Sequence, residues 1–476
     1  MPRTRPSTPP RPVKQLSLRL RPAALAAALA LAAPPAAAQT ADPARIAAGV
    51  DSLAAAALAG GRAAGLSIAV SLDGRPAIAR GYGYVDLEWK VPTPDRAVYQ
   101  IGSLTKQFTS AAVMQLVEQG RIDLDADVTT YLPDYHTQGR KVPVRRLLDH
   151  TSGIRSYTSI PEFAGIERRT FPRDTLVKLF SAQPYTFEPG TSESYNNSGF
   201  FLLGLIIERV SGQSYASYVK EKLFDRAGMR EARYCSESEV VPGMAHGYDM
   251  GEGGLGHAPA ISHAWPYAAG SLCASAADLD AWNRALHGGK VLGAAAYAEM
   301  IRPGALNDGT PLRYAKGIAV ADVAGRPALY HGGDIAGFAS YLAWFPESRL
   351  SVAVTVNSQG PVRPDAITRA VAELVLGKAA PPTARLKRKA AEYVGAYRGT
   401  GGMGEDLTVH VVTDSAGRLV LKSPFTHPDA PATLVYTGGE SFALDDKCVT
   451  FVRERGSVAR LSVDAVYGLM VLARQP

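Results

Sequence analysis

The sequence predicts an α+β fold for most of the chain, followed by a small antiparallel β-barrel or sandwich. Alternating apolar runs, typical of strands, occur at 66–72 and again at 350–356, near the two ends of segment 45–376. Between them the chain is mostly helical and rich in loops up to about Gly288. Strands at both ends must therefore pair across the helical insert. After residue 388, short alternating runs recur with turns between them, which is typical of a small barrel.

The first 38 residues have the pattern of a secretory signal peptide. An arginine-rich start leads into an apolar stretch at 23–33, and the segment ends in three alanines at 36–38. We expect cleavage after Ala38 and a periplasmic or secreted protein. A transmembrane anchor is the alternative, but the apolar stretch is too short to span a bilayer and is closed by Pro34 and Pro35. The mature chain is therefore expected to have no membrane span.

Net charge gives no reason to expect a nucleic-acid partner. The whole chain carries a formal charge of +7, and the predicted signal peptide holds six basic and no acidic residues, which leaves +1 for the mature chain. The sequence contains no G-x-S-x-G, HExxH or P-loop motif, so neither a metal nor a nucleotide cofactor is implied. The expected partner is a small-molecule or short-peptide substrate, and the oligomeric state is left open.

The three cysteines are Cys235, Cys273 and Cys448, an odd count without metal-type spacing. Export permits one disulfide, most plausibly Cys235 with Cys273, because Cys448 falls in another predicted domain. Three buried thiols are an equally good interpretation.

The larger predicted domain, 45–376, begins with a helix at 45–58. A β-hairpin follows, in which the apolar run 66–72 leads through a turn at Asp73-Gly74 into a second run from Ala77. A helical period then runs over 104–119 and stops at Gly120. Ser275 and Asp278 can form a capping box for a helix over 275–286. The predicted later elements are strands at 328–330, 341–345 and 350–356 and a closing helix at 364–376.

A linker is expected at 377–388 and a separate domain at 389–476. Its predicted strands are 407–412, 418–422, 432–436, 449–453, 458–463 and 467–473.

Ser103 and Lys106 are the candidate nucleophile and base. A serine hydroxyl is a weak nucleophile, and a lysine three residues later on the same helix lies within reach of it. The motif alone is weak, since Ser217 and Lys220 share the spacing. The second match lies in a charged amphipathic stretch without other catalytic residues, so we interpret it as a solvated helix face. Ser103 instead opens a helix, where free N–H groups favour developing negative charge.

Two further motifs follow in order: Tyr195-Asn196-Asn197, and His331-Gly332-Gly333 at the end of a predicted strand. With Ser103 and Lys106, they resemble the class C β-lactamases and their relatives, the DD-peptidases, D-aminopeptidases and β-lactamase-like esterases. The resemblance covers about 45–375 and extends to segments 147–153, 187–190 and 333–338. It implies a β-lactamase/transpeptidase-like fold, with an antiparallel sheet flanked by helices, and a lipocalin-like C-terminal appendage.

The resemblance also implies site roles. Ser103 forms the acyl-enzyme, Lys106 takes its proton, Tyr195 relays protons to the leaving group, and Asn197 holds a substrate amide. The amides of Ser103 and Asp334 form the oxyanion hole, beside the strand carrying His331, Gly332 and Gly333. The two glycines are expected to permit close backbone approach. His150 is interpreted as a structural histidine at a helix end.

One departure bears on the substrate. Where a true β-lactamase has Lys-Thr-Gly, this chain has His331-Gly332-Gly333. Because histidine is mostly neutral at pH 7, its pull on a substrate carboxylate should be weaker. The D-aminopeptidases of the family also carry histidine there.

We therefore expect a secreted serine hydrolase that acts on a D-amino-acid peptide or amide, as a D-aminopeptidase or DD-peptidase does. A short-chain ester and a β-lactam are the alternative substrates. A penicillin-binding or cell-wall-binding protein without turnover is the alternative from another class, which the intact catalytic set disfavours. The loops at 155–170 and 245–265 are expected to set the choice of substrate. The C-terminal domain is expected to flank the cleft and limit substrate size.

Overall fold

The computed structural model describes residues 42–380, 384–400, 406–423, 432–444 and 447–476. The predicted signal peptide at 1–38 lies outside these ranges. No helix of the described residues is long and apolar enough to cross a membrane.

A seven-stranded antiparallel sheet forms the centre of the first domain, in the order β10-β11-β12-β13-β1-β2-β3. β1 (Gly65–Leu72) pairs with β13 (Leu350–Val356), with Leu66 opposite Val356 and Val70 opposite Val352. The expected pairing of strands from the two ends of segment 45–376 is thus confirmed. The other strands are β2 (Arg75–Asp86), β3 (Val91–Pro92), β10 (Ala319–Val323), β11 (Arg326–Ile335) and β12 (Phe338–Phe345).

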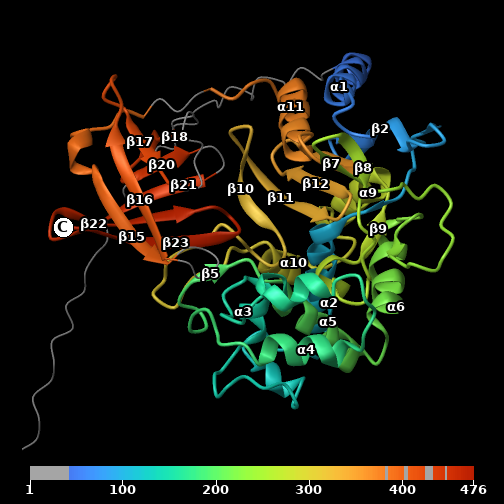
Figure 1. Ribbon diagram of the computed structural model, residues 1–476, viewed down its shortest axis with the longest axis horizontal. Coiled ribbons are helices and arrows are strands. Elements are labelled where there is room, and N and C mark those ends of the chain that lie inside the picture. Colours follow the sequence, from blue (N-terminus) through green and yellow to red (C-terminus); the bar gives the residue numbers. More distant parts are fainter. Residues whose placement is uncertain (1–41, 381–383, 401–405, 424–431, 445–446) are drawn as a thin grey trace, which may run out of the picture. The chain divides into compact units, whose positions relative to one another are not determined.

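Helices cover both faces of this sheet, since all seven residues of β13 are buried. α1 (Pro43–Leu58) and α11 (Pro364–Leu376) pack against each other, and α11 contacts β12 and β13 (Figure 1). α9 (Ala276–His287) contacts β1 and β13. The predicted capping box of α9 is present, because the Ser275 hydroxyl accepts from the Asp278 N–H and the Asp278 carboxylate accepts from the Ser275 N–H.

The helical region packs around α2 (Thr105–Glu118) and α5 (Asn197–Ser211), which contact each other. Every residue of α2 from Thr105 to Leu116 is buried, so this helix is a fixed central support. The remaining helices are α3 (Val144–Leu148), α4 (Arg173–Ser181), α6 (Tyr215–Val219), α7 (Asp225–Ala227), α8 (Tyr267–Gly270) and α10 (Ala294–Met300).

The C-terminal region is a nearly closed antiparallel barrel of nine strands, β15 to β23, around its own apolar core. Its strands are β15 (Gly395–Thr400), β16 (Asp406–Thr413), β17 (Leu419–Lys422), β18 (Ala432–Thr433), β19 (Val435–Gly438), β20 (Ser441–Leu444), β21 (Lys447–Glu454), β22 (Ser457–Asp464) and β23 (Gly468–Arg474). The predicted barrel is confirmed, with β15 and β20 as strands that the sequence prediction lacks.

Two three-stranded sheets include strands of the middle segment, which was expected to be mostly helix and loop, and each takes one strand from outside that segment. One is β4-β9-β6, from β4 (Tyr99–Gln100), β9 (Leu272–Ala274) and β6 (Arg233–Tyr234). The other is β14-β7-β8, from β14 (Ser358–Gln359), β7 (Tyr248–Gly251) and β8 (Gly254–His257). The disulfide expected between Cys235 and Cys273 is present, and Cys448 is free.

Candidate active site

Ser103 lies in a single 3-10 turn, Gly102–Leu104, that leads directly into α2. Gly102 has φ +52°, and a Cβ on it would come within 3.0 Å of the backbone N of Asp334. Glycine is therefore needed here both for the left-handed backbone and for the close approach to β11. The turn fixes Ser103 at the start of a buried helix and beside the strand that carries Asp334.

Lys106 is fully buried on the first turn of α2, and its Nζ lies 3.2 Å from the Ser103 Oγ. Nζ is also 2.7 Å from Asn197 Oδ1 and 2.9 Å from the carbonyl oxygen of Ala269. No carboxylate pairs with it within the described ranges. Burial lowers the pKa of Lys106 well below its ordinary value.

The hydrogen bonds of Lys106 suit a neutral amine. A neutral –NH₂ has two N–H donors and one lone pair, and here two acceptors and one hydroxyl surround it. Nζ is placed to donate to Asn197 Oδ1, to the Ala269 carbonyl and to Ser103 Oγ. A neutral amine keeps the first two bonds and can turn its lone pair to the Ser103 O–H. In that state Lys106 is placed to remove the Ser103 proton.

Tyr195 lies on the other side of Lys106, with its ring centroid 4.6 Å from Nζ. Burial raises the pKa of Tyr195, and the neighbouring Ser103 hydroxyl partly opposes this. Within the described residues its buried hydroxyl oxygen has no hydrogen bond of standard geometry. This hydroxyl is therefore available to donate a hydrogen bond to the leaving group of a substrate.

His150 holds the Tyr195 segment in place. It is buried, its φ is +62°, and its ring centroid lies 4.5 Å from that of Tyr195. Its Nδ1 accepts from the Asn196 N–H at 3.1 Å, and its carbonyl accepts from the Ser194 N–H at 3.1 Å. Burial, and secondarily Lys106, lowers the pKa of His150 well below its ordinary value. The predicted structural role is thus specifically that of positioning Tyr195.

Asn197 begins α5, and Asn196 caps that helix by accepting from the Gly199 N–H at 2.7 Å. The Asn197 side chain spans the site, because its Oδ1 accepts from Lys106 and its Nδ2 donates to Thr158 Oγ1 at 3.2 Å. The structure thus brings Asn197 together with Ser103, Lys106 and Tyr195.

β11 runs from Arg326 to Ile335. His331, Gly332 and Gly333 therefore lie inside the strand, whereas the sequence had placed them at its end. A Cβ on Gly333 would lie 2.1 Å from the Ile101 carbonyl oxygen, whereas one on Gly332 would meet nothing closer than 3.6 Å. The expected close backbone approach therefore holds for Gly333 alone. It lets β11 pack against the segment that precedes Ser103.

The His331 side chain is buried, and its Nε2 lies 2.9 Å from the Tyr314 hydroxyl. Burial, reinforced by the nearby Lys106, lowers the pKa of His331 to about 3. The imidazole is consequently neutral at pH 7, in line with the expected weak attraction for a substrate carboxylate.

Ser103, Asn197 and Asp334 line one pocket of about 180 Å³. The two loops expected to set specificity both contribute: Tyr157, Thr158 and Glu167 come from 155–170, and Pro259, Ile261 and Trp265 come from 245–265. The lining is largely apolar. Among these lining residues there is no lysine or arginine, and its ionisable side chains are Glu167, Asp334 and Tyr157.

A larger cleft of about 380 Å³ lies beyond Asp334 and includes Gly332, Arg363 and Arg369. Ser103 does not line it, and both arginines form ion pairs with Asp365. Because acylation requires the nucleophile, we assign the smaller pocket as the acyl-binding site.

The sequence did not indicate Tyr467, which reaches this site from the turn between β22 and β23. The Gly332 N–H donates to its hydroxyl at 3.2 Å, and the Tyr195 N–H donates to its carbonyl at 3.0 Å. Its ring also lies edge-on to that of Tyr195, 5.5 Å away. A lone tyrosine in a predicted barrel strand carries no motif, so sequence reasoning had no signal for it.

The second Ser-x-x-Lys match is not a site. Ser217 accepts from the Ser214 hydroxyl at 2.7 Å, and Lys220 forms a largely exposed ion pair with Asp225. The interpretation of this stretch as a solvated face is confirmed.

A family model described as Beta-lactamase matches residues 50–376, well over half of the chain. The fold and the Ser103–Lys106–Tyr195 arrangement agree with that match, and the chain belongs to the beta-lactamase family. Among its relatives is a D-aminopeptidase of Gluconobacter oxydans, 30% identical over 297 residues, which are 62% of this chain and 55% of that protein. A D-aminopeptidase of Cereibacter sphaeroides is 28% identical over 347 residues, 72% of this chain and 66% of that protein.

Similar solved structures include a D-stereospecific amidohydrolase from Streptomyces sp., with a TM-score of 0.58 and 26% identity, covering 70% of this chain and 99% of that one. An octameric penicillin-binding protein homologue from Pyrococcus abyssi covers 89% of this chain and 99% of its own, with a TM-score of 0.62 and 24% identity. The match to the two D-aminopeptidases named above spans 55% and 66% of their lengths, somewhat more than half.

Proposed function

We propose that this protein is a secreted serine hydrolase that cleaves the amide bond of a D-amino-acid derivative through an acyl-enzyme on Ser103. The observation that carries the proposal is the buried Lys106, which has no carboxylate partner among the described residues and whose Nζ lies 3.2 Å from the Ser103 Oγ. The D-aminopeptidase relatives support the amide class of substrate.

In the proposed reaction, neutral Lys106 takes the Ser103 proton as Oγ attacks the substrate carbonyl carbon. The negative charge that develops on the carbonyl oxygen is stabilised by the N–H groups of Ser103 and Asp334. Collapse of the tetrahedral intermediate breaks the C–N bond, and the Tyr195 hydroxyl gives its proton to the departing amine. Tyr195 is then reprotonated by Lys106, which carries the proton taken from Ser103, so both groups return to their starting states. Water then attacks the ester on Ser103, which releases the acid and restores the serine.

The charge of the pocket favours a substrate with a free amino group. Glu167 and Asp334 are the acidic residues among those that line it, and His331, on the same strand as Asp334, is neutral. An ammonium group is attracted to such a pocket, whereas a substrate carboxylate would meet like charge without a cation to hold it. This supports an aminopeptidase-like substrate over a DD-peptidase substrate or a β-lactam.

Matched substrates test this proposal. We expect kcat/KM to be highest for D-Ala p-nitroanilide, at least tenfold lower for its N-acetyl derivative, and lower still for nitrocefin. Glu167→Gln should reduce the preference for the free amine. Higher kcat/KM for nitrocefin or for p-nitrophenyl butyrate than for every amide would contradict the assigned substrate class. An absence of turnover on all of them would favour a binding protein.

A further inference from the structure

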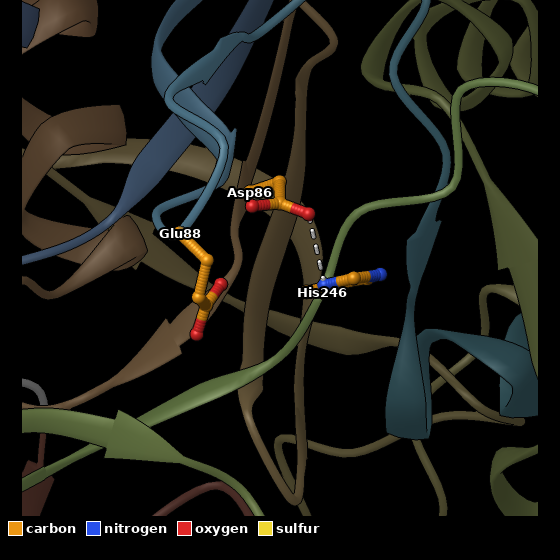
Figure 2. A group of neighbouring side chains, drawn as sticks. All are labelled: Asp86, Glu88 and His246. Atoms are coloured by element: carbon orange, nitrogen blue, oxygen red, sulfur yellow. Dashed lines mark ion pairs between the residues drawn. The ribbon is translucent and has the colours of Figure 1, made fainter.

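A second group of ionisable side chains lies outside the catalytic site, where the end of β2 faces the β7–β8 hairpin. Asp86 is the last residue of β2, and Glu88 lies in the turn that follows. His246 precedes β7, and His257 ends β8. Figure 2 shows Asp86, Glu88 and His246 turned toward a common space.

The distances between these groups are those of a metal-ligand set. One ligand atom from each of Asp86, Glu88 and His246 can be chosen so that all lie within 4.8 Å of one another. His246 Nδ1 is 3.4 Å from Asp86 Oδ2, and His257 Nε2 is 2.7 Å from Glu88 Oε1. Tetrahedral zinc with bonds of 2.0–2.1 Å has ligands about 3.3 Å apart, close to the 3.4 Å between His246 Nδ1 and Asp86 Oδ2. His257 contacts Glu88 and lies outside the group of three, so its exposed side chain would have to turn toward the ion to become the fourth ligand.

Each carboxylate is oriented by an outer hydrogen bond that leaves one oxygen for an imidazole. Asp86 Oδ1 accepts from the Trp89 N–H at 2.7 Å, and Oδ2 faces His246. Glu88 Oε2 accepts from the Tyr248 hydroxyl at 2.7 Å, and Oε1 faces His257. Such outer partners are what fix ligands around a protein-bound metal.

The histidines are positioned as well. The His257 ring stacks on Tyr248, with centroids 5.6 Å apart and an interplanar angle of 25°. The His246 N–H donates to the Val85 carbonyl at 2.9 Å, which ties this segment to β2. Among the ion pairs of the described residues, neither Asp86 nor Glu88 meets a lysine or arginine, so each carboxylate faces its imidazole without a competing cation.

We propose that Asp86, Glu88, His246 and His257 bind one divalent transition-metal ion of the zinc class. Two imidazoles with two carboxylates suit zinc better than calcium or magnesium, which prefer oxygen ligands throughout. The four residues are scattered over the sequence, which explains why no metal motif is visible in it.

The ion would act structurally. It would join the β7–β8 hairpin to the end of β2, and that hairpin supports the turn between β11 and β12, since the Gly337 N–H donates to Asp249 Oδ1 at 3.1 Å. Ile335 and Ala336 of this turn line the acyl-binding pocket. The site has no part in the proposed reaction, and its test does not depend on activity.

The test is zinc titration by calorimetry of the chelator-treated full chain, in a Cys448→Ser background that removes the free thiol. We expect one zinc ion per chain and a rise in Tm on adding zinc. His246→Ala and His257→Ala should each weaken binding by about 100-fold, and Tyr248→Phe, which keeps all four ligands, by about tenfold. His410→Ala, an exposed histidine on β16, is the matched control and should bind as the parent does.

Circular dichroism verifies that each variant is folded. The proposal would be overturned if the parent bound zinc no more tightly than the His246→Ala/His257→Ala double variant. It would also be overturned if His410→Ala weakened zinc binding as much as His246→Ala or His257→Ala does.

Discussion

At the scale of single residues, the proposed mechanism depends on the protonation state of Lys106, since only the neutral amine can take the Ser103 proton. The amine is fully buried, lacks a carboxylate partner within the described residues, and lies against the rings of Tyr195 and Phe200. A charged ammonium would have to give up its hydration here, so the neutral form is favoured. Burial favours the neutral amine, which can act as a base. For the same reason, Lys106 would carry no positive charge with which to attract an anionic group of the substrate.

We predict that activity is lost at low pH because Lys106 becomes protonated. Because burial lowers the pKa of Lys106, the amine is neutral above the lowered pKa and becomes protonated as the pH falls through it. The kcat/KM for D-Ala p-nitroanilide should therefore fall as the pH falls through that value, as a pH–rate profile will show. Lys106→Arg, which stays charged, should lose at least about 10³-fold at every pH. Activity of Lys106→Arg close to that of the parent would contradict the assignment.

The sequence was sufficient to find the candidate catalytic residues that the structure brings together, because they lie in contiguous motifs at fixed spacings. Ser103 and Lys106 share one helix, and Tyr195 and Asn197 flank one helix start. It was insufficient for Glu167 and Tyr467, and for His150 it indicated a structural role without its partner. These details come from tertiary contacts, such as the tilted ring contact of His150 with Tyr195, that no local pattern encodes.

At the scale of elements, the close packing of β11 on the segment before Ser103 brings together the two amides of the proposed oxyanion hole. Gly333 permits this contact, and the Ser340 hydroxyl strengthens it by donating to the Ile101 carbonyl at 2.9 Å. Ser103 and Asp334 belong to segments about 230 residues apart in the chain, so their amides meet only if this contact is kept.

Gly333→Ala is predicted to be destabilising, since its Cβ would lie 2.1 Å from the Ile101 carbonyl oxygen. We expect a loss of about 1–3 kcal/mol in the free energy of unfolding, measured by urea denaturation. Gly332→Ala is the matched control, because its nearest contact would be at 3.6 Å, and its loss should stay below about 1 kcal/mol. Equal losses in the two variants would show that the close approach does not govern stability.

Elements with strong local signals were predicted well. The Asp73-Gly74 turn, the Ser275 cap and the helix Pro364–Leu376 all rest on turn, cap or periodicity rules. The β7–β8 hairpin escaped prediction because its glycine-rich sequence, residues 251–256, has no alternation of apolar and polar residues. Its strands form by pairing with each other and with β14, which is a tertiary effect.

At the scale of the whole molecule, the barrel is joined to the catalytic site by backbone pairing. β23 pairs with β5 (Glu193–Ser194), which directly precedes Tyr195, and the turn before β23 carries Tyr467. In this turn Val466 has φ +70°, an unusual conformation for a β-branched residue, which the surrounding contacts maintain. This geometry supports the proposal that the C-terminal domain limits which substrates reach Ser103.

Tyr467→Ala in the full chain tests that proposal. Removing the ring should change the ratio of kcat/KM between D-Ala-containing tripeptides and D-Ala p-nitroanilide by at least tenfold, while hydrolysis of a small ester persists. A chain ending at Leu376 should shift the ratio in the same direction if it folds. An unchanged ratio in Tyr467→Ala would indicate that the barrel stabilises the protein without selecting substrates.

The most direct test of the central claim is mass spectrometry of the protein after reaction with a fluorophosphonate probe. We predict one adduct per chain, located on the peptide that contains Ser103, and none on the peptide that contains Ser217. The rate of labelling should fall at least about 10²-fold in Lys106→Arg, and the adduct should be absent in Ser103→Ala. An adduct on another serine, or labelling of Lys106→Arg at the parent rate, would contradict the assignment of Ser103 as the nucleophile and Lys106 as its base.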